Sequence, residues 1–468
     1  MISHRSLKAK KIQQPTPLAE RRDPNHTLKI GIWIYFFLWV FEGALRKWIL
    51  PQLSLPLLVV RDPIVLWLIY AAAKRGLLKS NIYFNGMLAF GVLSLFTAIF
   101  MGHGNVYTAI YGARTMLLYF SMIFVIGSVF NIEDVIKMGK VVVWISIPMT
   151  LLLVLQFYSP QYAWVNRGVG GDETGAGFGG ALGYFRPPGF FSFTNGTTCF
   201  YSMMAPFVIY FWLNTKEINR NLLILATAAL VIAIPISISR GLFLQVGVSV
   251  VFLLIAIARK PKYFGKVFLA TCLVAVALVA FSNVGFFKTA TSAFTSRFED
   301  ANETEGGLVE GVLGNRFLGS LVKGVTGSTE SMFGYGVGSG TSLGAQLLDN
   351  DEILLMADFE WIREVGELGL MGLFVILLRV GLAVKIGFAS FYKMKKDYIL
   401  PWLLMSVGFV IVTQGQWHQP TALGFCALIG GIWLASLKNK RLPKIVIKRK
   451  NALKQTVAPN LSAQAEKS

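Results

Sequence analysis

Charged side chains are scarce in this sequence. Only 15% of its 468 residues are Asp, Glu, Lys or Arg, whereas a soluble protein of this length carries roughly a quarter. Hydrophobic residues make up 54%, and apolar runs of about 20 residues, each long enough to cross the hydrocarbon core of a membrane, recur along the chain. The scarcity of charge excludes an ordinary soluble domain and predicts an all-α, polytopic integral membrane protein.

Cysteine and histidine are also few. The cysteines stand far apart in apolar runs, which excludes a disulfide framework and fits small buried hydrophobic residues. The histidines are scattered and give no metal site, and the sequence holds no Walker-type phosphate loop, nucleophile elbow or internal repeat. We therefore expect no metal and no cofactor. The cysteines and histidines are Cys199, Cys272, Cys426, His4, His26, His103 and His418.

The distribution of basic residues predicts the orientation. The segments on the same side of the membrane as the N-terminus hold most of the 44 lysines and arginines. The short loops at 50–55, 102–109 and 415–419, on the opposite side, hold none. By the positive-inside rule the N-terminal side is the cytoplasm. The net charge of +20 is then mostly this inward bias and not a nucleic-acid signal.

Twelve apolar runs predict about twelve transmembrane helices, an even number that places both termini in the cytoplasm. No cleavable signal is apparent, so the first span is expected to remain as an anchor. The spans are expected near 30–49, 56–73, 83–101, 110–130, 140–158, 196–213, 221–239, 241–258, 266–284, 364–382, 398–414 and 420–437.

The spans and loops divide the chain into five regions. They are a basic cytoplasmic N-terminus (1–29), spans one to nine with a Gly-rich outer loop at 159–195 (30–284), a large acidic outer loop (285–362), three further spans (363–437) and a basic cytoplasmic tail (438–468). In the large loop Leu313, Phe317 and Leu321 share a helical face, which predicts a helix lying on the outer surface.

Four arginines fall on the outer face, against the inward bias. An arginine near lipid and away from the cytoplasm is costly, so it commonly holds something in place. Outward-facing guanidinium groups favour an anion in the outer leaflet, such as a lipid-linked phosphate. They are Arg186, Arg240, Arg316 and Arg363. For Arg240 a snorkelling side chain is the alternative, and for Arg186 a loop that enters a helix with Asn195 as N-cap.

Carboxylates lie beside Arg363 in the segment ADFEWIREVGELGLMG. Glu360, Arg363, Glu364 and Glu367 have helical spacing, and Asp358 lies just before them. One interpretation is capping with salt bridges along a helix. The other is a carboxylate base, Glu360 or Asp358, beside an arginine that binds an anion. A further outer group, Glu42, Arg46 and Arg61, favours structural ion pairing between the first two spans.

Four short segments, taken in order, resemble the O-antigen ligase and polymerase superfamily of bacterial envelopes. RPPGFFSFTN resembles that family's R-x-x-G-x-F…N entry to a span, and SISRG resembles its S-x-S-R-G turn. GNRF with MFGYGVGSG, and ADFEWIREVGELGLMG, resemble the segments that precede and open the next span. The sequence departs from the pattern at one point, where Asp358 replaces the family's proposed histidine base and Phe359 stands where asparagine is usual.

The resemblance implies a glycosyltransferase of the bacterial inner membrane. It would transfer glycan from an undecaprenyl-diphosphate carrier to a glycan or lipid acceptor without a metal, with Arg240 and Arg316 on the diphosphate. The motifs do not separate polymerase from ligase, and the oligomeric state is open. The alternatives are a transporter or flippase of a lipid-linked anion, or a non-catalytic part of a polysaccharide export machine.

Overall fold

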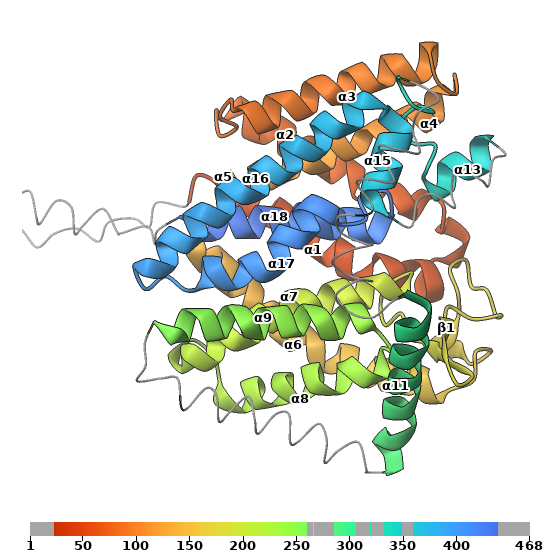
Figure 1. Ribbon diagram of the computed structural model, residues 1–468, viewed down its shortest axis with the longest axis vertical. Coiled ribbons are helices and arrows are strands. Elements are labelled where there is room, and N and C mark those ends of the chain that lie inside the picture. The colour runs from red at the N-terminus through yellow and green to blue at the C-terminus, as the bar shows by residue number, and fades with distance from the viewer. Residues whose placement is uncertain are drawn as a thin grey trace, which may run out of the picture.

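The protein is a bundle of helices (Figure 1). The computed structural model describes residues 23–259, 265, 285–305, 319, 332–348 and 359–438. The protein is mostly helical, at 76%, and within these described ranges seven helical segments are long and apolar enough to cross a membrane. These are His26–Ile49, Pro56–Lys74, Ile82–Phe100, Val106–Val129, Ile132–Tyr158, Arg240–Ala258 and Leu370–Lys395. The expected total of twelve stays a prediction, and the expected span at 266–284 lies outside the described residues.

Eleven of the twelve predicted runs coincide with helices, because each is an apolar stretch closed by polar or turn residues. The elements are α1 (His26–Ala44), α2 (Asp62–Lys74), α3 (Ile82–Phe100), α4 (Val106–Arg114), α5 (Phe120–Val129), α6 (Ile132–Tyr158), α7 (Thr194–Leu213), α8 (Arg220–Ile236), α9 (Arg240–Ala258), α11 (Gly285–Glu305), α13 (Ser342–Leu348), α15 (Glu360–Leu368), α16 (Leu370–Lys395), α17 (Leu400–Gln414) and α18 (Pro420–Ser436). Short π-helical turns at Leu45–Ile49 and Thr115–Tyr119 extend α1 and join α4 to α5.

Helix α18 forms the centre of the bundle. It packs against α5, α7 and α17, and nearly every one of its side chains is buried. Around it, α16 lies against α17 and α3, while α6 lies against α7 and α8. In Figure 1, α18 and α17 lie between α16 and α3 on one side and α7 and α6 on the other. The loop that leads into α18, residues 415–419, is therefore largely buried.

The described chain starts and ends at the same end of the bundle. Near the start of α1, Lys29 forms an ion pair with Asp134 at the start of α6 (2.7 Å). Just past α18, Lys438 donates a hydrogen bond to the carbonyl of Ser128 at the end of α5. This arrangement fits an even number of crossings. The side of the membrane that this end faces stays a prediction, and we call it here the basal end.

The segment expected to open the tenth span is a separate helix. The structure ends α15 at Leu368 and begins α16 at Leu370, not at 364. Gly369 between them has φ 59°, which glycine adopts without strain. A side chain at Gly369 would also meet the carbonyl of Met332. Glu360, Arg363, Glu364 and Glu367 are therefore carried on a short helix beside α16.

The outer loop at 159–195 contains a hairpin that the all-α expectation omitted. Strand β1 (Phe178–Ala181) pairs antiparallel with β2 (Tyr184–Arg186). Leu182 and Gly183 connect them, both with positive φ. Tyr184 stacks on Phe157 at the end of α6, with ring centroids 4.9 Å apart. The hairpin therefore lies at the end of the bundle opposite the basal end, called here the apical end.

Candidate functional site

The loop between α17 and α18, Gly415–Gln419, is the meeting point of the apical end. The main-chain N–H of Trp417 donates to Glu360 of α15 (3.1 Å), and the ring of His418 contacts the same carboxylate (3.0 Å). On its other side, Asn195 of α7 donates to the side chains of Gln416 (3.2 Å) and Gln419. The loop thus joins two of the four segments that carry the family resemblance.

Asn195 is not the N-cap that its position predicted. Helix α7 begins at Thr194 with Phe193 as N-cap, and no side chain caps it. The amide of Asn195 is used instead on the two glutamines of the α17–α18 loop. The residue is therefore a contact between segments and not a local helix signal.

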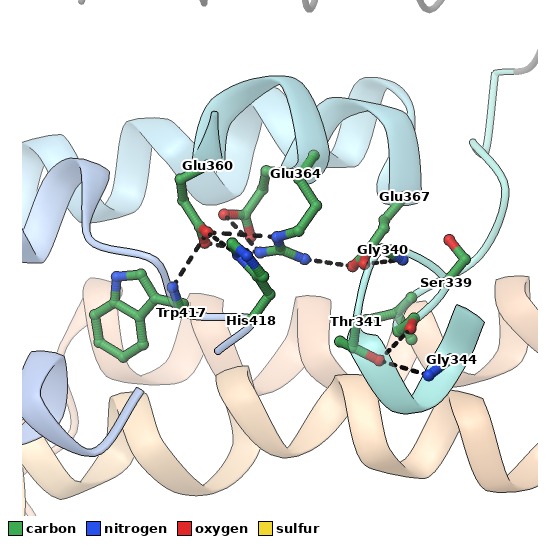
Figure 2. A network of polar contacts seen from close by, with 12 residues as sticks. Ser339, Gly340, Thr341, Gly344, Glu360, Glu364, Glu367, Trp417 and His418 are labelled. Carbon is green, nitrogen blue, oxygen red and sulfur yellow. Dashed lines mark hydrogen bonds and ion pairs between the residues drawn. The ribbon is translucent and has the colours of Figure 1, made fainter. Parts of the chain in front are cut away.

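One face of α15 carries four charged side chains, as their spacing predicts (Figure 2). Arg363 lies among three carboxylates, with its Nη2 2.7 Å from Glu360 and its Nη1 2.6 Å from Glu367. The third carboxylate, Glu364, is 3.7 Å away. All four side chains are buried. The predicted alternative of salt bridges along one helix face describes this arrangement.

A second arginine, which the sequence analysis passed over, completes this cluster. Arg379 of α16 lies 3.1 Å from Glu360 and 2.5 Å from Glu364. It is 1% exposed and stands nine residues into an apolar helix. A charged residue at such a position is a strong sequence signal for a partner inside the protein.

Two arginines and a histidine lower the pKa of Glu360. Burial alone would raise its pKa, but the charges of Arg363 and Arg379 and the hydrogen bond from His418 offset this, so the pKa of Glu360 lies below its ordinary value. Both of its oxygens already accept hydrogen bonds. These contacts favour a role for Glu360 in positioning its neighbours, and its role as a base stays a prediction. Asp358 lies outside the described residues.

Glu364 behaves differently from Glu360. Burial raises its pKa, and the negative charges of Glu360 and Glu367 act in the same direction, although Arg379 and Arg363 oppose them. Three carboxylates (Glu360, Glu364 and Glu367) surround two guanidinium groups, which leaves one negative charge in excess. A proton on Glu364 removes this excess.

His418 is the imidazole nearest to the predicted site. Its Nδ1 faces the carboxylate of Glu360 at 3.0 Å and the side chain is 7% exposed. An ionised carboxylate accepts hydrogen bonds only, so Nδ1 carries a proton, and in the neutral imidazole Nε2 is then the nitrogen with the lone pair. Within the described ranges, Glu360 is the only hydrogen-bond partner of His418. The arrangement orients an imidazole with one nitrogen available to take a proton.

Arg240 begins α9 directly after a strained turn. Ile238 before it is buried and has φ 47°, a conformation that β-branched residues rarely adopt. Ser239 caps the helix by accepting from the amide of Leu242 (3.2 Å), and its hydroxyl also contacts Thr198 of α7 (2.9 Å). Because Thr198 and Asn195 lie on the first turn of α7, this turn connects the Arg240 region to the loop of His418.

The structure brings Arg186 close to Arg240. Arg186 ends β2, and burial together with the positive charges of Arg297 and Arg240 lowers its pKa to about 10. Its Nε is buried without a hydrogen-bond partner in the described structure. Arg363 is neutralised by carboxylates on α15, and Arg316 lies outside the described residues. The predicted convergence of four arginines is therefore tested only for Arg186 and Arg240, which lie near each other.

The expected ion pairing between the first two spans is present. Arg61 lies 3.1 Å from Glu42, which also faces Arg46 at 3.4 Å. Arg61 in addition donates to the carbonyl of Pro420 at the start of α18 (2.6 Å). The pairs are buried and fix α1 and α2 against the central helix α18. Because Arg61 binds at the start of α18, this contact also helps to position the adjacent loop that carries His418.

Comparisons with known proteins found no match: no family model, no curated protein and no solved structure is similar to this chain.

Proposed function

We propose that the protein is a metal-independent glycosyltransferase of the polysaccharide polymerase or ligase type. It transfers glycan from an undecaprenyl-diphosphate-linked donor to a hydroxyl group of a glycan or lipid acceptor, in the inner membrane of a bacterium with both termini in the cytoplasm. The observation that supports this best is the buried Glu360–His418 pair, which shares the apical end with Arg186 and Arg240. A base and an anion site at one membrane surface are what this reaction requires.

In the proposed reaction one proton is transferred, one glycosidic bond forms and the bond to the diphosphate breaks. The acceptor hydroxyl gives its proton to Nε2 of His418 as its oxygen attacks the anomeric carbon of the donor. The bond from that carbon to the diphosphate oxygen breaks, and the diphosphate leaves with the electron pair. Glu360 stabilises the imidazolium that forms. Arg186 and Arg240 stabilise the charge that gathers on the leaving diphosphate, more in the transition state than in the ground state.

The test replaces the base while keeping the fold. In His418→Gln the side chain can still donate to Glu360, but it cannot accept a proton, so transfer should fall by roughly 10²–10⁴-fold. Polysaccharide is measured on gels, and protein level on immunoblots. His26→Gln, an exposed histidine at the basal end, is the matched control and should be silent. Full transfer by His418→Gln contradicts the proposal, and loss of transfer in Asp358→Asn alone would assign the base to Asp358.

The location of unused donor separates an enzyme from a transporter. If the protein transfers glycan, the His418→Gln strain should accumulate lipid-linked donor that is accessible to glycosidase from the outer face. If the protein is a flippase, the donor should accumulate on the cytoplasmic leaflet. Arg186 and Arg240, the proposed diphosphate-binding residues, lie at the apical end, whereas transporters bind substrate near the bilayer midplane.

A further inference from the structure

Helix α11 brings an arginine to the start of α9. Phe243, in the first turn of α9, is in ring contact with Phe294 and Phe298 of α11, with centroids 5.8 and 5.9 Å apart. Arg297 lies between these two phenylalanines in the sequence. Because Arg240 precedes Phe243 by one helical turn, the ring contacts place the Arg297 region of α11 beside the region of Arg240. From the sequence this segment is expected to be part of an outer loop, and Arg297 has no predicted role.

The β1–β2 hairpin packs against the same corner of the bundle, where α11 meets the start of α9. Strand β1 packs against α11. A Cβ atom added at Gly180 of β1 would lie 2.7 Å from the side chain of Ile238 and 3.5 Å from that of Arg186. Arg186 therefore lies over the turn that leads into Arg240. Three separate elements, β2, α9 and α11, each supply one guanidinium group to this corner.

Two of these arginines have no carboxylate partner in the described part of the chain. Among the described residues neither Arg186 nor Arg297 forms an ion pair with a carboxylate, and both are partly buried. The contrast with Arg363 and Arg379 is sharp, because those two are surrounded by glutamates. Like charges held together in a partly buried place are costly unless an anion offsets them.

We propose that Arg297 completes an anion site with Arg186 and Arg240, and that this site binds the diphosphate of a lipid carrier. Three guanidinium forks from three directions match a group with several oxygens and two or more negative charges. The identity of the carrier rests on the proposed function, whereas the anion site rests on the arrangement of the arginines. Arg297 is thus a binding residue for the leaving group.

The experiment measures anion binding directly. The full-length protein is placed in nanodiscs of zwitterionic lipid, and inorganic pyrophosphate and farnesyl diphosphate are titrated by calorimetry. Arg297→Gln should weaken the binding of both by roughly 10- to 100-fold, as expected for one charge-assisted hydrogen-bonding partner. Arg297→Lys should recover part of the affinity. Lys288→Gln, an exposed cation on the same helix, is the matched control and should bind like wild type.

The outcomes separate this site from the proposed function. Unchanged pyrophosphate affinity in Arg297→Gln, or absence of saturable binding in the wild type, overturns the site even if glycan transfer depends on His418. Weakened binding together with normal glycan transfer keeps the site and contradicts the proposed function. Farnesyl diphosphate should bind more tightly than pyrophosphate because its chain stays in the lipid. Equal affinities overturn the assignment to a lipid carrier. Unfolding curves recorded for each variant exclude a general loss of fold.

Discussion

Arg379 offers the sharpest test of how the α15 cluster is held. Its guanidinium group contacts Glu360 at 3.1 Å and Glu364 at 2.5 Å, and it is almost fully buried. The substitution Arg379→Met removes the charge but keeps a long side chain of similar shape. It also leaves the apolar surroundings in α16 intact.

The expected loss follows from the charge count. With all three carboxylates ionised, the wild type has one negative charge in excess of its two arginines. In Arg379→Met the same carboxylates face Arg363 alone, and two charges are in excess. Breaking a buried ion pair by removing one partner typically costs about 3–5 kcal/mol. We expect the free energy of unfolding of Arg379→Met to fall by this amount.

The assay is reversible unfolding in mixed detergent micelles, followed by tryptophan fluorescence. The double variant Arg379→Met/Glu364→Gln restores an excess of one charge and should recover about 0.5–3 kcal/mol, the usual coupling of neighbouring sites. Arg259→Met, an exposed arginine at the end of α9, is the control and should change the free energy by less than about 0.5 kcal/mol. A loss below about 1 kcal/mol in Arg379→Met, or no recovery in the double variant, refutes the reasoning.

Three further predictions concern pH, the hairpin and topology. Because the pKa of Glu364 is raised, the folded state binds its proton more tightly than the unfolded state, so the free energy of unfolding should fall as pH rises above the ordinary pKa of 4.5. In unfolding curves, Glu364→Gln should make this fall smaller. The lowered pKa of Glu360 affects stability only at lower pH. Leu182 has φ 52° in the turn before Gly183, a place where Asn-Gly is preferred, so Leu182→Asn should leave stability unchanged or raise it by about 1 kcal/mol, and faster proteolysis of the 159–195 loop would contradict this. Reporter fusions after residues 170 and 330 should report an external location and fusions after 262 and 445 an internal one; a cytoplasmic signal at 330 contradicts the topology.

The positions of the helices were predictable, because they depend on local composition. Apolar runs and their polar ends located α1 to α9, α17 and α18 to within a few residues at most ends, whereas α16 runs from Leu370 to Lys395 instead of the expected 364–382. The shared face of Glu360 and Arg363 was predictable too, because it needs only helical spacing. The break at Gly369 was not recognised, although a glycine between two helical stretches is a turn signal.

Which residues contact one another at the site could not be predicted from the sequence. His418 contacts Glu360, which lies 58 residues earlier in the chain. The hydrophobic periodicity of a sequence does not indicate which loops of a helix bundle contact each other. The missing histidine of the family pattern directed attention to Asp358 and Glu360 and away from the α17–α18 loop. Arg379 is a different case, because a charge within an apolar helix could have been singled out.

The central position of α18 has a consequence for how the protein is made. The indole of Trp39 donates to the carbonyl of Thr421, which lies 382 residues later in the chain, and Arg61 and Asn195 likewise bind groups at or next to the start of α18. A ribosome synthesises the N-terminal part first, at a rate of roughly 5–20 residues per second. Helices α1, α2 and α7 therefore wait in the membrane for tens of seconds with these polar groups unsatisfied. Assembly of the bundle is completed by its central helix, so insertion factors that shield early helices should be needed until α18 has left the ribosome.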